Sequence, residues 1–194
     1  MQRMCFRDLA GRRTVEDAGG RCFKKLKSFD LDARFEVEGG CLGILGASGC
    51  GKSMTLKAVA GLVKPDQGQI RRDGQVLFDS ARKIDVPPRK RQVGYLFQNY
   101  ALFPNMTVAE NIEAGLLKGR LDREARKERM RELVRQFRLE GLENQYPARI
   151  SGGQQQRTAL ARIFASDARC ILLDERFLPW TAISGRRCRW SWPG

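Results

Sequence analysis

Residues 46–53, Gly-Ala-Ser-Gly-Cys-Gly-Lys-Ser, constrain the fold of this chain more than any other segment. They follow an apolar run over 41–45 that indicates a buried strand, and they open a helical pattern over 52–62. Glycines let the backbone curl so that successive N–H groups point toward a bound anion. The start of a helix adds unpaired N–H groups and the positive end of its dipole. A strand, a glycine loop and a helix in this order predict a phosphate-binding loop.

The spacing of this segment, Gly, four residues and then Gly-Lys-Ser, is that of the P-loop. We expect Lys52 to reach the β- and γ-phosphates of a nucleotide and Ser53 to bind Mg²⁺. The simpler interpretation is a glycine-rich turn before an ordinary helix. It does not explain why a strand pattern precedes the loop and a helical pattern follows it, as the P-loop motif requires. The expected nucleotide-binding residues are Gly46, Ser48, Gly49, Cys50, Gly51, Lys52, Ser53 and Met54.

Composition limits the class of protein. A chain of 194 residues is long enough for one sizeable domain with a subdomain. It has no apolar run of membrane-spanning length, and its first residues lack the apolar stretch of a secretory signal, so the cytosol is the expected compartment. Six cysteines without a C-x-x-C pair, and no histidine, argue against a zinc site and a disulfide framework.

The net charge of +14 is concentrated at the two ends of the chain. Residues 1–27 contribute +5 and residues 176–194 contribute +4, although together they make up less than a quarter of the sequence. A basic chain can bind nucleic acid or an anionic membrane surface. Because the excess lies outside the segments that carry motifs, we interpret it as loosely structured basic ends.

Periodicity predicts the remaining elements, whereas residues 1–22 show neither a helical nor a strand period. Strands are expected at 29–37, 69–71, 75–78, 93–97 and 169–173. Helices are expected to begin at the capping boxes of Thr107 and Ser151, and another is expected over 122–138, where Met130, Leu133, Val134 and Phe137 form an apolar face. Strands that alternate with helices around a P-loop favour a parallel sheet covered on both faces.

The last of these strands ends in two acidic residues, Asp174 and Glu175. Acidic side chains at the carboxyl end of a strand beside a P-loop suit a Mg²⁺–phosphate site. We expect Asp174 to hold the metal, and Glu175 to orient and deprotonate an attacking water. The pattern is weak by itself, because many strands end in Asp or Glu, and it gains its meaning from the P-loop in the same chain.

The segment from Ser151 to Gln154 is the second informative motif. A capping box explains Ser151 and Gln154. It does not explain the two glycines between them, Gly152 and Gly153, because glycine lowers helix stability. Glycines at the start of a helix are typical of sites where the backbone closely approaches a phosphate.

These motifs resemble those of the ATP-binding subunits of ABC transporters over about residues 23–175. The signature of that family, L-S-G-G-Q, matches 150–154 with Ile150 in place of leucine, and Gln98 matches the glutamine of its Q-loop. The resemblance implies an α/β fold: a P-loop NTPase (RecA-like) parallel sheet core with an inserted ABC helical subdomain, incomplete at the C-terminus. The implied divisions are an unassigned basic segment 1–22, a nucleotide-binding core 23–97 and 158–175, a helical subdomain 98–157 and an aberrant tail 176–194.

The resemblance also implies a shared site that binds ATP and Mg²⁺. Its implied catalytic residues are Lys52, Gln98 and Glu175, and its implied metal ligands are Ser53, Gln98 and Asp174. Two such domains, a homodimer or a pair of nucleotide-binding subunits, would enclose each ATP between one P-loop and the partner's segment Ser151, Gly152, Gly153 and Gln154. Phe29 is the expected adenine-stacking residue, with Phe23 and Leu26 as alternatives.

Two segments, 74–80 and 87–98, look like those of molybdate or sulfate importers. The resemblance therefore implies a subunit that binds and hydrolyses ATP for import of molybdate or a related oxyanion such as sulfate or tungstate. It would lie peripherally at the cytoplasmic face of the inner membrane, with permease subunits as direct partners and a solute-binding protein as an indirect one. Two alternatives remain open: a non-hydrolysing nucleotide-binding remnant without a transport role, and a soluble ABC ATPase that acts on nucleic acid, although we expect no nucleic-acid partner.

After Glu175 the chain departs from the family pattern. The family continues with Pro-Phe-Ser-Ala-Leu-Asp and later carries a catalytic histidine, whereas residues 176–182 read Arg-Phe-Leu-Pro-Trp-Thr-Ala and the chain has no histidine. The codons of Trp180 and Thr181, TGG and ACN, contain the aspartate codon GAC in the shifted frame. We hypothesise that the reading frame slips near residues 175–176, and we expect the chain as written to fold poorly or to bind ATP with little turnover.

Overall fold

The computed structural model describes residues 2–6, 17–26, 29–38, 41–117, 121–166 and 168–174. A four-stranded sheet has the order β4-β1-β9-β8 and a five-stranded sheet has the order β3-β2-β5-β6-β7. The strands are β1 Gln2–Phe6, β2 Asp17–Lys25, β3 Asp30–Glu38, β4 Cys41–Ile44, β5 Gln67–Arg72, β6 Gln75–Asp79, β7 Ile84–Asp85, β8 Val93–Leu96 and β9 Cys170–Leu173. The helices are α1 Lys52–Ala60, α2 Val108–Leu116, α3 Arg123–Gln136 and α4 Gly152–Ala165, with short 3₁₀ turns at Pro88–Lys90 and Pro147–Arg149.

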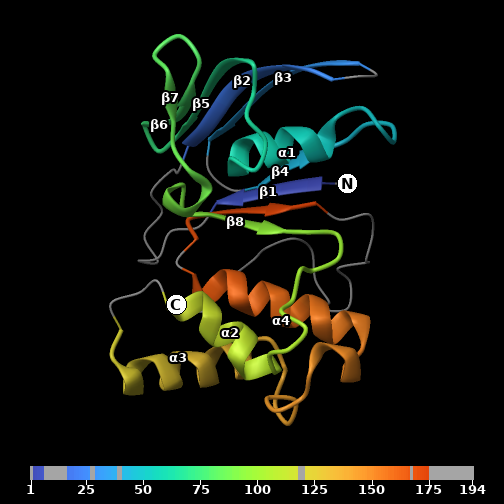
Figure 1. Ribbon diagram of the computed structural model, residues 1–194, viewed down its shortest axis with the longest axis vertical. Coiled ribbons are helices and arrows are strands. Elements are labelled where there is room, and N and C mark those ends of the chain that lie inside the picture. The colour runs from blue at the N-terminus through green and yellow to red at the C-terminus, as the bar shows by residue number, and fades with distance from the viewer. Residues whose placement is uncertain are drawn as a thin grey trace.

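Figure 1 shows the five-stranded sheet and α1 at one end of the molecule and α2, α3 and α4 at the other, with the four-stranded sheet between them. The predicted α/β architecture is confirmed, and the helices at 52, 107, 122 and 151 begin within one residue of their expected starts. No helix among the described residues is both long and apolar enough to cross a membrane. The tail 176–194 lies outside the described residues.

Strand β9 separates two hydrophobic cores. Cys170 and Leu172 are buried in a cluster with α1 and the five-stranded sheet, whereas Ile171 and Leu173 are buried in a cluster with α2, α3 and α4. Because successive side chains of a strand point to opposite faces, four residues connect both cores. A strand that is buried on both faces must be apolar throughout, which explains the uninterrupted run before Asp174.

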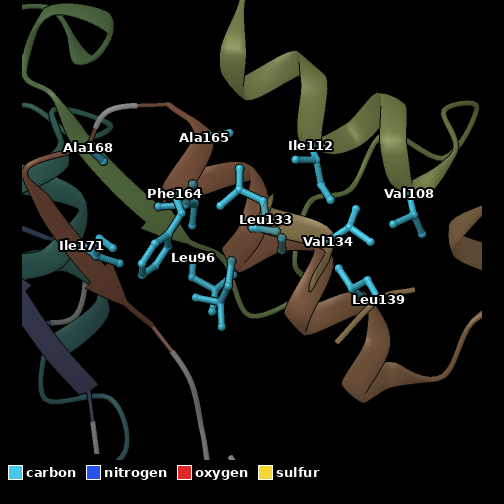
Figure 2. Packing of buried hydrophobic residues seen from close by; sticks show 14 of the residues in the cluster. Leu96, Val108, Ile112, Leu133, Val134, Leu139, Phe164, Ala165, Ala168 and Ile171 are labelled. Atoms are coloured by element: carbon cyan, nitrogen blue, oxygen red, sulfur yellow. The ribbon is translucent and has the colours of Figure 1, made fainter. Parts of the chain in front are cut away.

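The helical core is built from three helices that pack on β8 and β9. Figure 2 shows Ile112 of α2, Leu133 and Val134 of α3, and Phe164 of α4 around Leu96. Helices α2 and α4 approach closely at Gly115, where a Cβ atom would lie only 2.3 Å from the carbonyl oxygen of Arg162. The predicted boundary between residues 157 and 158 falls inside α4, which continues as one helix from the signature segment into this core.

The N-terminal segment 1–22, which the sequence leaves unassigned, contains strand β1 and the start of strand β2. Strand β1 is antiparallel both to β4 and to β9, with Met4 in register with Leu42 and Leu172. The five residues of β1 are too few to show a period, and backbone hydrogen bonds to two neighbouring strands decide its place. Strands β4, β8 and β9 still run in the same direction, because β8 and β9 are parallel and β1 opposes both β4 and β9.

Both predicted capping boxes are confirmed. The Thr107 hydroxyl accepts from the Glu110 backbone N–H at 3.3 Å, and the Glu110 carboxylate accepts from the Thr107 N–H at 2.7 Å. Ser151 and Gln154 make the same pair of bonds at 3.3 and 2.7 Å. Each box satisfies backbone donors that the first helical turn leaves without a partner, so both helices begin where the sequence predicts.

A buried arginine fixes the C-terminal end of α1. The guanidinium of Arg91 is 1% exposed and donates to the carbonyl oxygens of Ala58 at 2.9 Å, Val59 at 2.8 Å and Val86 at 2.6 Å. It also contacts the Asp85 carboxylate at 3.1 Å. Burial lowers the pKa of Arg91, and Asp85 opposes that shift. Arg91 thereby ties the last carbonyl groups of α1 to the segment that enters β8.

We predict that Arg91→Leu lowers the free energy of unfolding by about 3 kcal/mol, because buried carbonyl groups lose their donors. Arg89→Leu is the matched control, since Arg89 is an exposed arginine two residues away. Urea unfolding followed by circular dichroism measures both variants. Equal losses for the two variants would show that the Arg91 contacts do not stabilise the fold.

Candidate nucleotide site

The predicted P-loop lies between β4 and α1, as the sequence requires. Gly51 is the N-cap of α1 with φ 91° and ψ 4°, and no side chain caps this helix N-terminus. The first turn of α1 contains no acidic residue either. The backbone donors and the positive dipole end of α1 are therefore not neutralised by a capping side chain, which is the electrostatic setting that a phosphate prefers.

Lys52 folds back over its own loop. Its ammonium donates to the carbonyl oxygens of Gly46 at 2.8 Å and Ala47 at 2.6 Å, and it lies 3.5 Å from the Cys50 sulfur. A flexible lysine side chain is thus held at the mouth of the glycine loop by the loop backbone. Its positive charge lies beside the N–H groups that the sequence predicts to bind phosphate.

Gly51 is also the position where the loop meets the five-stranded sheet. A Cβ atom there would lie 2.6 Å from Cδ1 of Leu31 and 3.2 Å from Cε2 of Phe29, and its φ of 91° is strained for any other residue. The Phe29 ring, 37% exposed, therefore lies against the start of α1. Phe23 and Leu26, the alternatives for adenine stacking, are half-buried. The stacking role itself stays a prediction.

Ser53 and Asp174, 121 residues apart, meet at the end of the sheet. The Ser53 hydroxyl donates to Oδ1 of Asp174 at 2.8 Å, and the Tyr95 hydroxyl donates to Oδ2 of Asp174 at 2.6 Å. The backbone N–H of Asp174 donates to the carbonyl oxygen of Leu96 at 3.2 Å, which extends the pairing of β8 and β9 by one residue. Burial, and then the bond to Asp174, raise the pKa of Tyr95, so its hydroxyl stays protonated and acts as the donor.

The Ser53 and Asp174 oxygens fit a magnesium ion by their chemistry. Mg²⁺ prefers oxygen ligands and is commonly held by one or two protein groups together with waters and substrate phosphates. A serine hydroxyl and a carboxylate within hydrogen-bond distance, beside a P-loop, supply such a donor set. No cluster of three or more His, Cys, Asp or Glu occurs in the described ranges, so a site built entirely of such side chains is not indicated there.

Gln98 leaves the sheet at the same edge as Asp174. It is exposed in the turn that follows β8, and the last residues of β8 and β9, Leu96 and Leu173, are register partners. The next residues, Tyr100 with φ 58° and Ala101 with φ 44°, are in the left-handed region. The turn after β8 thus brings Gln98 to the same edge of the sheet as Asp174, whereas Glu175, the predicted base, lies outside the described residues.

Two residues that sequence reasoning missed support the loop after Gln98. Asn111 of α2 is 0% exposed and donates to the carbonyl oxygens of Phe103, Met106 and Thr107 at 3.1, 3.0 and 3.0 Å. Arg162 of α4 donates to the Tyr100 carbonyl oxygen at 3.1 Å and lies 5.0 Å from the centre of the Phe103 ring. The sequence offered one signal for Asn111: it is a polar residue on the apolar face of the helix predicted to begin at Thr107, where a buried hydrogen-bonding role is expected.

The signature segment belongs to the helical end of the molecule. Ser151 caps α4, and α4 packs with α2 and α3 against one face of β8 and β9, while α1 packs against the other face. Gly152 and Gly153 are exposed, and a Cβ atom at either position would meet nothing within 4 Å. Nothing among the described residues therefore requires glycine there.

Comparison with known proteins agrees with this arrangement. The family model described as ABC transporter matches residues 31–177. A sulfate/thiosulfate import ATP-binding protein of Synechocystis is 45% identical over 155 residues, which are 80% of this chain and 41% of that protein. A spermidine/putrescine import ATP-binding protein of Methylococcus capsulatus is 45% identical over 81% of this chain and 38% of its own length. A molybdenum import ATP-binding protein of Paramagnetospirillum magneticum is 40% identical over 76% of this chain and 40% of its own length.

A solved structure shows the same fold. A dimeric ATP-binding cassette in a post-hydrolysis state, bound to ADP and phosphate, superposes with a TM-score of 0.57 at 28% identity, over 77% of this chain and 70% of that chain. The chain spans about two fifths of the length of the three relatives named above. On the family match and the shared fold together, this chain belongs to the ABC transporter family and has the ATP-binding cassette fold.

Proposed function

We propose that the chain is an ATP-binding and hydrolysing subunit of an ABC import system. The observation that carries this proposal is the contact between Ser53 and Asp174 beside an uncapped P-loop helix, because it unites the residues for phosphate and metal in one place. The similar proteins named as import ATP-binding proteins support the direction of transport.

In the proposed mechanism, the P-loop backbone holds the phosphates and Lys52 neutralises charge on the β- and γ-phosphates. Ser53 and Asp174 would hold Mg²⁺, with Gln98 reaching it from the next strand, and the ion would supply charge neutralisation at the transferred phosphoryl group. Glu175 would orient and deprotonate the attacking water. The protein contributes position and electrostatics rather than a covalent intermediate.

The proposed active form contains two copies or two related subunits. Gly152 and Gly153 lower the stability of the start of α4, and an added Cβ atom at either would meet nothing within 4 Å among the described residues. We infer that the approach of a partner's phosphate, and not packing within the described part of the chain, favours glycine there. The N-terminus of α4, between the capping residues Ser151 and Gln154, would then face the ATP on a partner's P-loop. The dimeric form of the similar cassettes supports this arrangement.

We further propose permease subunits as direct partners and a solute-binding protein as an indirect one, with the chain peripheral at the cytoplasmic face of the inner membrane. The proposed solute is molybdate or a related oxyanion, sulfate or tungstate. Relatives named for sulfate/thiosulfate and molybdenum import support the oxyanion class. A spermidine/putrescine relative matches at the same 45% identity as the sulfate one, so the class rests on segments 74–80 and 87–98.

A non-hydrolysing nucleotide-binding form is the second candidate. The observation that favours it is the sequence of residues 176–182, which departs from the family pattern directly after Glu175, the proposed base. The two candidates share ATP binding and differ only in phosphate release, so the same protein preparation distinguishes them.

We expect Lys52→Ala to weaken binding of ATP by about 10-fold or more, because a charge-assisted interaction with the phosphates is lost. Lys57→Ala is the matched control, since Lys57 is in the last turn of the same helix, away from the loop. Fluorescence titration with a labelled ATP measures both affinities. Unchanged binding in Lys52→Ala would refute the proposed phosphate site.

Glu175→Gln should retain ATP affinity and lower the rate of phosphate release by about 100-fold or more, because general base catalysis contributes that much. Phosphate release under saturating Mg²⁺-ATP measures the rate. A wild-type chain that binds ATP and releases no phosphate would favour the non-hydrolysing candidate, and a wild-type rate in Glu175→Gln would exclude Glu175 as the base.

Gly153→Ala should have opposite effects on folding and on assembly. The free energy of unfolding should rise by up to about 1 kcal/mol, because alanine favours the helix over glycine and nothing lies within 4 Å of the added methyl group. ATP-dependent dimer formation, followed by light scattering, should weaken because the methyl group blocks close approach to the partner's phosphate. Undiminished ATP-dependent dimers would contradict the proposed role of this segment.

A further inference from the structure

Both carboxylate oxygens of Asp174 are engaged by hydroxyl groups from different elements. Ser53 of α1 donates to Oδ1 at 2.8 Å, and Tyr95 of β8 donates to Oδ2 at 2.6 Å. The proposed mechanism uses Ser53 and Asp174 and assigns nothing to Tyr95. The shorter of the two bonds therefore belongs to a residue without an assigned role.

The placement of Tyr95 follows from the sheet. Tyr95 is the register partner of Leu172, which precedes Asp174 by two residues, so Leu172 and Asp174 share a face of β9. Tyr95 and Leu172 both pack in the core that contains α1. The Tyr95 ring also packs against the Phe97 ring, with centroids 4.7 Å apart and planes at 56°. The pairing of β8 and the contact with Phe97 fix the position of the Tyr95 ring, and this position places the Tyr95 hydroxyl within hydrogen-bond distance of Oδ2 of Asp174.

We propose that Tyr95 is a positioning residue of the metal–nucleotide site, whose hydroxyl orients the Asp174 carboxylate so that Oδ1 faces Ser53. The proposal rests on the proposed function, since it concerns the same site. A carboxylate can rotate about its terminal bond, and a hydrogen bond to one oxygen sets the direction of the other. A phenylalanine at this position would fill the same space and leave Oδ2 without this donor.

The arrangement gives β8 two roles at one edge of the sheet. Its residue 95 holds Asp174, and the turn after its last residue, Leu96, carries Gln98. Only two residues, Leu96 and Phe97, therefore separate the tyrosine that orients a metal ligand from the glutamine that is proposed to reach the same metal ion. A displacement of residues 95–98 would therefore shift the Asp174 carboxylate through its hydrogen bond with the Tyr95 hydroxyl.

The test compares Tyr95→Phe and Tyr95→Leu in the full 194-residue chain. Affinity for a fluorescent ATP is measured with Mg²⁺ and with EDTA, and Mn²⁺ binding in the presence of ATP is measured by electron paramagnetic resonance. We expect Tyr95→Phe to retain the affinity measured in EDTA and to lose about 10-fold of the metal-dependent gain and of Mn²⁺ affinity, as outer-shell substitutions do. Tyr146→Phe, at a tyrosine that is 49% exposed, is the control for removal of a hydroxyl and should change neither value.

The outcomes separate the hydroxyl from the ring. If Tyr95→Phe reproduces the metal effect of Tyr95→Leu, the hydroxyl is responsible and the proposal stands. If only Tyr95→Leu has an effect, or if Tyr95→Phe lowers affinity equally in Mg²⁺ and in EDTA, Tyr95 acts through packing and the proposal is overturned. If the wild-type chain binds no ATP at all, the proposed function itself fails, and this is visible before any variant is measured.

Discussion

The hydrogen bond between Ser53 and Asp174 is the contact on which the candidate site depends. It joins the first turn of α1 to the residue after β9 at 2.8 Å, although neither element pairs with the other. Each partner is held independently: α1 by the buried Arg91 at its far end, and Asp174 by the continuation of β9 pairing with β8. The geometry of the site is therefore a property of the whole sheet and not of the glycine loop alone.

Strand β1 sets the spacing between β4, which leads into the P-loop, and β9, which ends directly before Asp174. It lies between β4 and β9 and opposes both, so the strand that enters the P-loop is separated from the strand that ends at Asp174 by one strand. Neighbouring strands lie roughly 4.8 Å apart, so one inserted strand places β4 and β9 roughly 10 Å apart. Helix α1 packs across this gap on β1 and β8, and this placement brings the Ser53 hydroxyl to 2.8 Å from Asp174.

In the proposed function, nucleotide binding and assembly with a partner involve the elements on opposite faces of β9. On one face, α1 places Lys52 and Ser53 at the loop, and on the other face α2, α3 and α4 form a second core that ends in the capped helix of Ser151. The described residues give no packing reason for the two glycines at that helix start, which agrees with its proposed role in binding a partner's ATP. In the proposed function, the starts of α1 and α4 both face phosphate from different layers of one chain, so the proposed shared site needs a second copy or a related subunit.

The sequence by itself determined those elements whose residues are close together along the chain. The glycine loop, both capping boxes, the apolar run before Asp174 and the helix over 122–138 all follow from spacing of a few residues, and the structure confirms them. The tertiary structure alone decided β1, because its place depends on backbone pairing with strands about 40 and about 170 residues away. It also decided the hydrogen-bond partners of Tyr95, Arg91 and Asn111, because packing aims these polar groups at residues that no local period can indicate.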